Sequence, residues 1–140
     1  CESKIREGEI ELFHRTKFEG ISIRRTFDMK KDSLNVTIDV SAPGKISPCQ
    51  LIEQIPYLRK KGLTFSGIGD GIRHLRVSLP SGAGVLLEFS RPVTVRQGPI
   101  STAVQNPPGY EIGLLEVLFD HSFDGTKNVF TYQIKADDAK

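Results

Sequence analysis

Three histidines are the first side chains in this sequence that could carry out chemistry. His14, His74 and His121 are the only histidines among the 140 residues, and imidazole readily binds metals and transfers protons near neutral pH. Carboxylates lie near two of them in the sequence, at Glu9, Glu11, Asp120 and Asp124. A shared metal or acid-base site would require three different strands to bring the histidines together. The alternative is three separate, partly exposed histidines, of which His121 is the first to test.

Sugar binding is a second chemistry that the sequence allows. Sugar rings stack on exposed aromatic planes, and guanidinium groups hold carboxylates or sulfates as paired forks. The chain has no Trp and three Tyr, and two of these tyrosines lie beside prolines or a Pro-rich stretch, where they could be exposed. Arg24 and other arginines could hold an acidic glycan, although they could equally be solvated residues on the wet faces of strands. The candidate ligand-binding residues are Tyr57, Tyr110, Arg73, Arg76, Arg96 and His121.

Other motifs in the sequence indicate structure and not chemistry. Residues 67–71 (Gly-Ile-Gly-Asp-Gly) lack the spacing and the following Lys-Ser or Lys-Thr of a phosphate-binding loop, so they predict a tight turn. Asn35 begins a formal N-glycosylation triplet in the middle of an expected strand. Cys1 and Cys49 are either one bridge closing a long loop or two separate thiols, and they form no Cys-x-x-Cys pair. We therefore predict no catalytic residue, no metal and no cofactor within this chain.

Composition narrows the class of protein. The chain has 38% hydrophobic and 26% charged residues and a net charge of +2, which is ordinary for a globular domain. The charges are interspersed, which argues against a nucleic-acid partner, and no apolar run is long enough to span a bilayer. We expect one domain over residues 1–140. Because the chain begins at Cys1, we expect a piece of a longer protein, with a mature lipoprotein as the alternative.

The clearest structural signal lies in residues 21–40. Leu34, Val36, Ile38 and Val40 alternate with polar residues, which is the period of a strand with one dry and one wet face. Upstream of them, Ile21, Ile23 and Phe27 occupy alternate positions of a second run, in which only Arg25 is not apolar. A short polar connector separates the two runs. The pattern predicts a β-hairpin, which is marginal alone and requires further strands to cover its apolar face.

The remaining chain supplies such strands. Residues 49–58 are expected to be strand-like or irregular, because Pro56 would interrupt the helix that the apolar spacing allows. Residues 97–109 contain three prolines and predict a long loop, and Pro92 indicates an edge or a bend between two strands. About nine or ten short strands without helices predict an all-β antiparallel sandwich. A sandwich is favoured over a barrel because strand and loop lengths are uneven. The further strands are expected at residues 9–16, 63–65, 72–79, 85–89, 93–95, 110–119 and 129–134.

The hairpin resembles one found in carbohydrate-active proteins. Its strands, residues 23–27 (Ile-Arg-Arg-Thr-Phe) and 32–40 (Asp-Ser-Leu-Asn-Val-Thr-Ile-Asp-Val), are similar to those of galactose-mutarotase-like domains. They are also similar to the C-terminal sandwiches of heparinase-like polysaccharide lyases, and the likeness extends in style over residues 20–134. The catalytic pieces of those families are missing, since no His is paired with a suitably spaced Glu and no Tyr/His/Arg cluster occurs. The resemblance implies a non-catalytic β-sandwich module attached to a polysaccharide-degrading enzyme.

Three functions are compatible with these observations. The first is a sandwich module that supports a neighbouring catalytic domain or contacts an anionic polysaccharide. The second is a structural or protein-interaction domain of a secreted or surface protein, using its edge strands for contact. The third is a small enzyme that uses the histidines. A secreted or cell-surface location, with a periplasmic one also possible, accompanies the first two functions.

Overall fold

The computed structural model describes the backbone of residues 2–6, 9–15, 21–42, 50–101, 111–119 and 127–137, and the side chains within 21–42, 50–100, 111–119 and 127–137. In these ranges the chain forms ten strands and no helix, so the expected all-β class is confirmed. The described part contains no helix long and apolar enough to cross a membrane. The strands are β1 (Glu2–Arg6), β2 (Glu9–Arg15), β3 (Ser22–Met29), β4 (Ser33–Ser41), β5 (Leu51–Arg59), β6 (Thr64–Ser66), β7 (Gly69–Ser78), β8 (Gly84–Ser101), β9 (Glu111–Phe119) and β10 (Lys127–Asp137).

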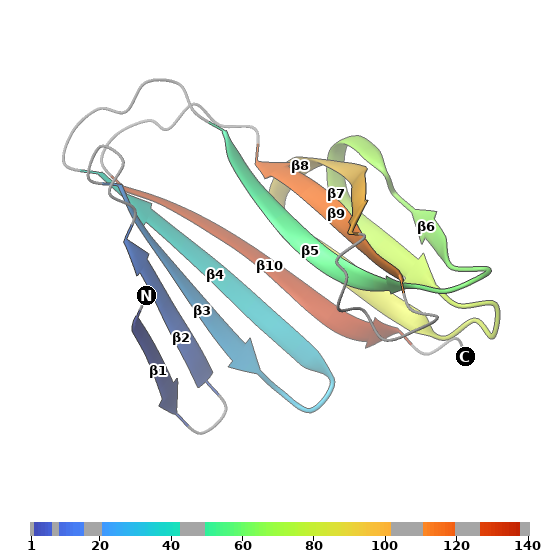
Figure 1. Cartoon of the computed structure of the whole chain (residues 1–140), viewed down its shortest axis with the longest axis horizontal. Helices are drawn as coiled ribbons and strands as arrows, with labels where there is room; N and C mark the ends of the chain where they lie inside the picture. The colour runs from blue at the N-terminus through green and yellow to red at the C-terminus, as the bar shows by residue number, and fades with distance from the viewer. Residues whose placement is uncertain are drawn as a thin grey trace.

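All strand pairs are antiparallel, and the order is β1-β2-β3-β4-β10-β8-β7-β6, with β9 pairing both β8 and β5. Figure 1 shows β1 to β4 side by side, β5 to β9 on the other side of the molecule, and β10 running between the two groups. The predicted hairpin is β3–β4, in which Ile23 pairs with Val40 and Phe27 with Val36. Its turn is closed by the Lys30 amide, which donates to the carbonyl of Ser33 at 2.8 Å.

Strand β8 connects the two layers of the sandwich. The first layer is β1-β2-β3-β4-β10-β8-β7-β6, and the second layer is β9 and β5, which continue from the second half of β8. Its first half pairs with β10, Phe89 lying opposite Tyr132. Its second half pairs with β9, Val95 lying opposite Val117. Pro92 separates the two halves, and a proline cannot donate a hydrogen bond to a ladder. An edge or a bend was expected at this proline, and the structure has a register shift there, because Ile72 of β7 pairs with Val93 and His74 with Glu88. Beyond it β8 pairs with β9, which in turn pairs with β5.

The core lies between these two layers. Val36, Ile38 and Val40 are at most 2% exposed, as the alternation in their strand predicted. Phe119 of β9 and Phe130 of β10 contact each other at 4.9 Å between ring centroids, and both are almost completely buried. Burying each such side chain contributes about 1.5–3 kcal/mol relative to leaving it exposed.

The strands differ from the expectations at several places. β1 was not predicted. Of the two alternatives for residues 49–58, the strand-like one is confirmed, because β9 pairs with β5 along its whole length. The strands expected at residues 85–89 and 93–95 are one continuous strand. Residues 97–101, expected to be loop, belong to the same strand, because a register shift between Gln97 and Ile100 absorbs Gly98 and Pro99.

Turns and termini complete the comparison. Gly67 has a φ of +100° and lies in the two-residue connection between β6 and β7. The turn expected over residues 67–71 is therefore confined to residues 67–68, and residues 69–71 belong to β7. Asn35 lies in the middle of β4, as expected, and its side chain donates to Asp28 at 3.4 Å. The charged tail expected from Lys135 onward is strand as far as the end of β10. The expectations for Cys1, Cys49, residues 102–110 and residues 120–126 lie outside the described residues.

Candidate functional site

The predicted arginines are each held by a partner in the structure. Arg76 on β7 forms an ion pair with Asp137, and its Nη2 also donates to the Gly82 carbonyl at 3.4 Å. Arg73 donates to the carbonyl of Ser90 at 3.4 Å. Both arginines lie on β7, but they share no partner: Ser90 belongs to β8, Asp137 to β10 and Gly82 to the turn before β8.

Arg96 lies elsewhere, on the second half of β8, where it forms an ion pair with Glu116 of β9. The Glu116 side chain is only 14% exposed, and Gln54 of β5 donates to it at 3.4 Å. The hydrogen bond from Arg96 and its positive charge hold the pKa of the Glu116 carboxyl below its usual value. Gln54, Glu116 and Arg96 thus form one polar row across β5, β9 and β8.

The histidine hypothesis is not tested by the described residues. His74 is the only one of the three histidines whose side chain the structure describes, and its Nδ1 lies 3.9 Å from Glu88. Tyr110 and His121 lie outside the described residues, and for His14 only the backbone is described. Among the side chains that are described, no group of three or more His, Cys, Asp or Glu residues could hold a metal ion.

The remaining predicted residue, Tyr57, lines a cavity of about 630 Å³ at the end of β5. We call it the β5–β6 cavity, because the turn between these strands forms one wall. The Tyr57 ring contacts the Phe65 ring edge-on at 5.0 Å, and it also lies across Gly113 of β9. A Cβ at position 113 would lie 2.3 Å from the Tyr57 Cζ, so the ring requires glycine beneath it. The lining residues are Tyr57, Arg59, Lys60, Lys61, Gly62, Leu63, Phe65, Gln97 and Glu111.

A tight turn presents the cationic side of this cavity. The Leu63 amide donates to the Lys60 carbonyl at 3.1 Å, and Gly62 has a φ of +82°. A turn with positive φ at its third residue favours glycine there. A Cβ on Gly62 would also lie 2.5 Å from the Pro80 side chain. The local sequence Lys-Lys-Gly therefore holds two ammonium groups at the mouth of the cavity.

The charges in the β5–β6 cavity are unequal. Arg59 forms an ion pair with Glu111 at 2.9 Å. Lys60 and Lys61 are exposed, and neither makes an ion pair with any described residue. Three cationic side chains thus face one carboxylate, beside an aromatic wall formed by Tyr57 and Phe65. This combination could bind an anion that also carries an apolar face.

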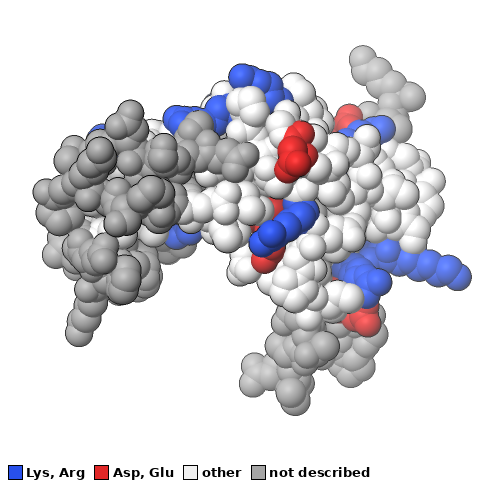
Figure 2. All heavy atoms as spheres, turned by 90° about the horizontal axis from the view of Figure 1, so that it is seen from above, with Lys and Arg blue, Asp and Glu red and all other residues white. Residues whose placement is uncertain are grey.

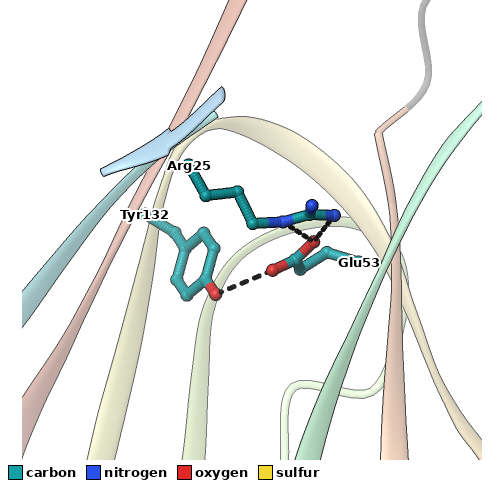
Figure 3. Close-up of polar contacts among 3 residues, drawn as sticks. All are labelled: Arg25, Glu53 and Tyr132. Carbon is teal, nitrogen blue, oxygen red and sulfur yellow. Dashed lines mark hydrogen bonds and ion pairs between the residues drawn. The ribbon is translucent and has the colours of Figure 1, made fainter. Parts of the chain in front are cut away.

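A second polar group, which the sequence analysis did not identify as a site, lies between the layers. Glu53 of β5 is 7% exposed. Nε and Nη2 of Arg25 donate to its Oε2 at 3.2 and 3.0 Å, and the Tyr132 hydroxyl donates to its Oε1 at 3.4 Å. Figure 3 shows the three side chains pointing toward one another from β3, β5 and β10. Burial and the negative charge of Glu53 raise the pKa of Tyr132 above its usual value.

The sequence did contain a signal for this cluster. Arg25 is the one residue that breaks the apolar parity of its strand. Glu53 occupies the same parity as Leu51, Ile55 and Tyr57, an alternation that the helical spacing of the apolar residues in this segment conceals. Two residues of opposite charge at inward positions of two strands predict a buried pair, because neither charge is stable alone in a core.

Outside these two places the charges are mixed. Figure 2 shows blue and red side chains next to each other at several separate places on the face in view. This agrees with the net charge of +2 and with the interspersed pattern in the sequence. Local geometry, and not an overall field, therefore decides where an anion could bind.

Comparison with known proteins identifies the fold. The chain is similar to a putative aldose 1-epimerase from Escherichia coli K12, with a TM-score of 0.68 and 11% identity over 99% of this chain and 68% of that one. It is also similar to heparinase III (TM-score 0.60, 11% identity) over 98% of this chain. A third similar structure is a heparan sulfate lyase from Pedobacter heparinus (TM-score 0.59, 7% identity), aligned over 99% of this chain.

The expected resemblance to mutarotase-like and heparinase-like sandwiches is thus confirmed as a likeness of fold. The chain spans only 21% of the heparinase III chain and 21% of the heparan sulfate lyase chain. No family model and no curated protein sequence matches it. Since identities this low establish the fold alone, the function has to be inferred from the chain's own residues.

Proposed function

We propose that this chain is a non-catalytic β-sandwich module of a polysaccharide-degrading enzyme, and that it contacts an anionic glycan through the β5–β6 cavity. The observation that carries the proposal is the pair Lys60 and Lys61, without ion-pair partners among the described residues, beside the aromatic wall of Tyr57. The shared fold with domains of an epimerase and two lyases supports a carbohydrate setting. A secreted or cell-surface location and a neighbouring catalytic domain belong to the same proposal.

The chemistry of the cavity suits a carboxylated or sulfated sugar. Ammonium groups act as mobile point charges that follow an anion without fixed geometry. The half-buried Tyr57 ring and Phe65 offer an apolar edge for a sugar ring. Gln97 and the Arg59–Glu111 pair supply donors and acceptors for hydroxyl groups. Affinity is expected to be modest, because the cationic side chains are exposed to solvent and salt.

Calorimetric titration with a sulfated heparin tetrasaccharide tests this proposal, with neutral maltotetraose as the reference sugar. The variant Lys60→Ala/Lys61→Ala removes the two cavity ammonium groups. Each exposed charge contact contributes about 0.2–1 kcal/mol, so we expect about a tenfold loss of affinity in total. Raising the salt concentration should weaken binding of the sulfated tetrasaccharide to the unmodified chain more than to the variant.

The chain provides a matched control for that variant. Lys30 and Lys31 form another exposed Lys-Lys pair in the β3–β4 turn, outside the lining of the cavity. Lys30→Ala/Lys31→Ala changes the net charge equally and should retain the affinity of the unmodified chain. If the two variants lost the same affinity for the sulfated tetrasaccharide, only net charge would matter. If the unmodified chain bound maltotetraose as tightly as the sulfated tetrasaccharide, the negative charge of the ligand would not matter. Either result would refute the proposal.

One observation favours the second candidate function, a structural or protein-interaction domain. The outward face of β5 carries Ile52, 41% exposed, and Leu58, 51% exposed, which pair across the ladder with Leu118 and Ile112 of β9. Exposed apolar side chains on one face are typical of contact surfaces. If the sulfated tetrasaccharide does not bind, this face becomes the better guide to function.

A further inference from the structure

A second cavity lies along the same strand as the β5–β6 cavity. Its volume is about 550 Å³, and its lining consists of Arg25, Ile52, Glu53, Gln54 and Glu116. We call it the β3–β5 hollow, because β3 and β5 contribute four of these residues. Unlike the first cavity, it contains no lysine among its lining residues.

The charges around the hollow are balanced. Glu53 is paired with Arg25 at 3.0 Å, and Glu116 is paired with Arg96. The lining itself contains two carboxylates and one guanidinium group, that of Arg25, and the Arg96 guanidinium that compensates Glu116 lies outside the lining. A charged ligand therefore gains little, whereas an uncharged ligand meets polar groups whose charges are already compensated.

Hydrogen-bonding capacity remains on several of these groups. Arg25 uses Nε and Nη2 on Glu53, and its Nη1 has no hydrogen bond to a described residue. Gln54 uses its amide nitrogen on Glu116, which leaves its carbonyl oxygen as an acceptor. Each carboxylate oxygen can accept two hydrogen bonds. The hollow thus offers both donors and acceptors, and Ile52 is its apolar lining residue.

We propose that the β3–β5 hollow binds an uncharged, hydroxyl-bearing sugar unit. Each hydroxyl both donates and accepts, so it can pair with a carboxylate and a guanidinium at once, and Ile52 can cover the C–H face of the ring. The inference deepens the proposed function and rests on it for the class of ligand. It adds a second subsite with the opposite charge preference.

The two subsites are aligned by β5. Glu53 and Tyr57 are four residues apart on one strand, which corresponds to about 13 Å at the rise of a β-strand. Both cavities include residues of β5: Ile52, Glu53 and Gln54 line the hollow, and Tyr57 and Arg59 line the β5–β6 cavity. An oligosaccharide running along β5 would place an acidic unit beside Lys60 and Lys61 and a neutral unit in the hollow.

Amide chemical-shift mapping of the ¹⁵N-labelled chain with galactose and with N-acetylglucosamine tests this inference. We expect saturable shifts at Arg25, Gln54 and Glu116 that are insensitive to salt. Gln54→Leu removes an exposed side chain of the hollow and leaves the buried Arg25–Glu53 pair in place. It should weaken binding about fivefold, the equivalent of one lost hydrogen bond.

Gln133→Leu is the matched control, because it makes the same change on β10, outside the lining of both cavities, and should leave neutral sugar binding unchanged. Absent shifts, shifts confined to the β5–β6 cavity, or equal effects of the two variants would each overturn the inference. The map of the unmodified chain decides the matter even if a variant does not fold. If these sugars fail while Lys60→Ala/Lys61→Ala still weakens the sulfated tetrasaccharide, the second subsite alone is refuted. If the neutral sugars bind in the hollow while Lys60→Ala/Lys61→Ala leaves binding of the sulfated tetrasaccharide unchanged, the anionic site alone is refuted.

Discussion

The buried pair of Arg25 and Glu53 supports a prediction in which a second mutation rescues a first. Arg25→Met removes the cation and leaves the Glu53 side chain, 9% exposed, with the hydroxyl of Tyr132 as its remaining described hydrogen-bond partner. Removing one partner of a buried pair costs about 3–5 kcal/mol. We expect Arg25→Met to cost about 3–4 kcal/mol, a large part of the usual 5–15 kcal/mol of folding stability.

Glu53→Gln should be much milder. The amide keeps the volume of the side chain and retains an acceptor oxygen, although it cannot bond both Arg25 and Tyr132 as the carboxylate does. The Arg25 side chain is 28% exposed, so its charge can still reach water. The cost should be about 1–2 kcal/mol, the charge-assisted part of the hydrogen bond.

The double variant distinguishes a charge pair from simple packing. In Arg25→Met/Glu53→Gln no uncompensated charge remains, so the double variant should be about 1–2 kcal/mol more stable than Arg25→Met alone. Urea unfolding followed by far-ultraviolet circular dichroism measures this. With slopes of about 1–3 kcal/mol per molar urea, the single Arg25→Met variant should lower the midpoint by roughly 1–4 M. Additive losses, or a cost below about 1 kcal/mol for Arg25→Met, would contradict this account of the pair.

Three further predictions follow from individual groups. The raised pKa of Tyr132 means that folding stability falls as pH rises above about 10, the ordinary value for tyrosine; between about pH 10 and 11, where an ordinary tyrosine ionises, the folded unmodified chain should have the same absorbance at 295 nm as Tyr132→Phe. The lowered pKa of Glu116 means that its stabilising contribution is present above the ordinary value and is lost as pH falls through the lowered one; Arg96→Gln should raise this pKa in a carboxyl NMR titration. Gly113→Ala should cost about 1–3 kcal/mol in thermal unfolding, and less in a Tyr57→Ala background, since the clash is with that ring.

The two cavities differ in how a charged residue is used. In the β5–β6 cavity, Lys60 and Lys61 are exposed and contribute little to stability, which leaves them free for a ligand. In the β3–β5 hollow, Arg25 and Glu53 hold β3 against β5 as well as lining a surface. Mutations in the first cavity are therefore expected to change binding with little effect on stability, whereas mutations of the buried pair are expected to change both.

The sequence by itself determined the features that depend on neighbours along the chain. The alternation of Val36, Ile38 and Val40 predicted a half-buried strand, because side chains alternate between faces in any strand. The Lys60-Lys61-Gly62 turn is also local, since a positive φ favours glycine wherever the chain turns this way. Arg25, the break in an apolar row, marked a buried charge without indicating its partner.

Only the tertiary structure decided which distant residues meet. Glu53 is 28 residues from Arg25 and 79 from Tyr132, and strand pairing that places β5 over β3 and β10 is not encoded in any local period. The prolines show the same limit. A proline discourages a strand locally, yet three prolines lie within strands. Pro56 lies in β5, which pairs only with β9 among the described strands. Pro92 and Pro99 lie where the register of β8 shifts against its neighbours. Whether a proline breaks a strand depends on whether its missing N–H faces a partner, and that is set by the neighbouring strands.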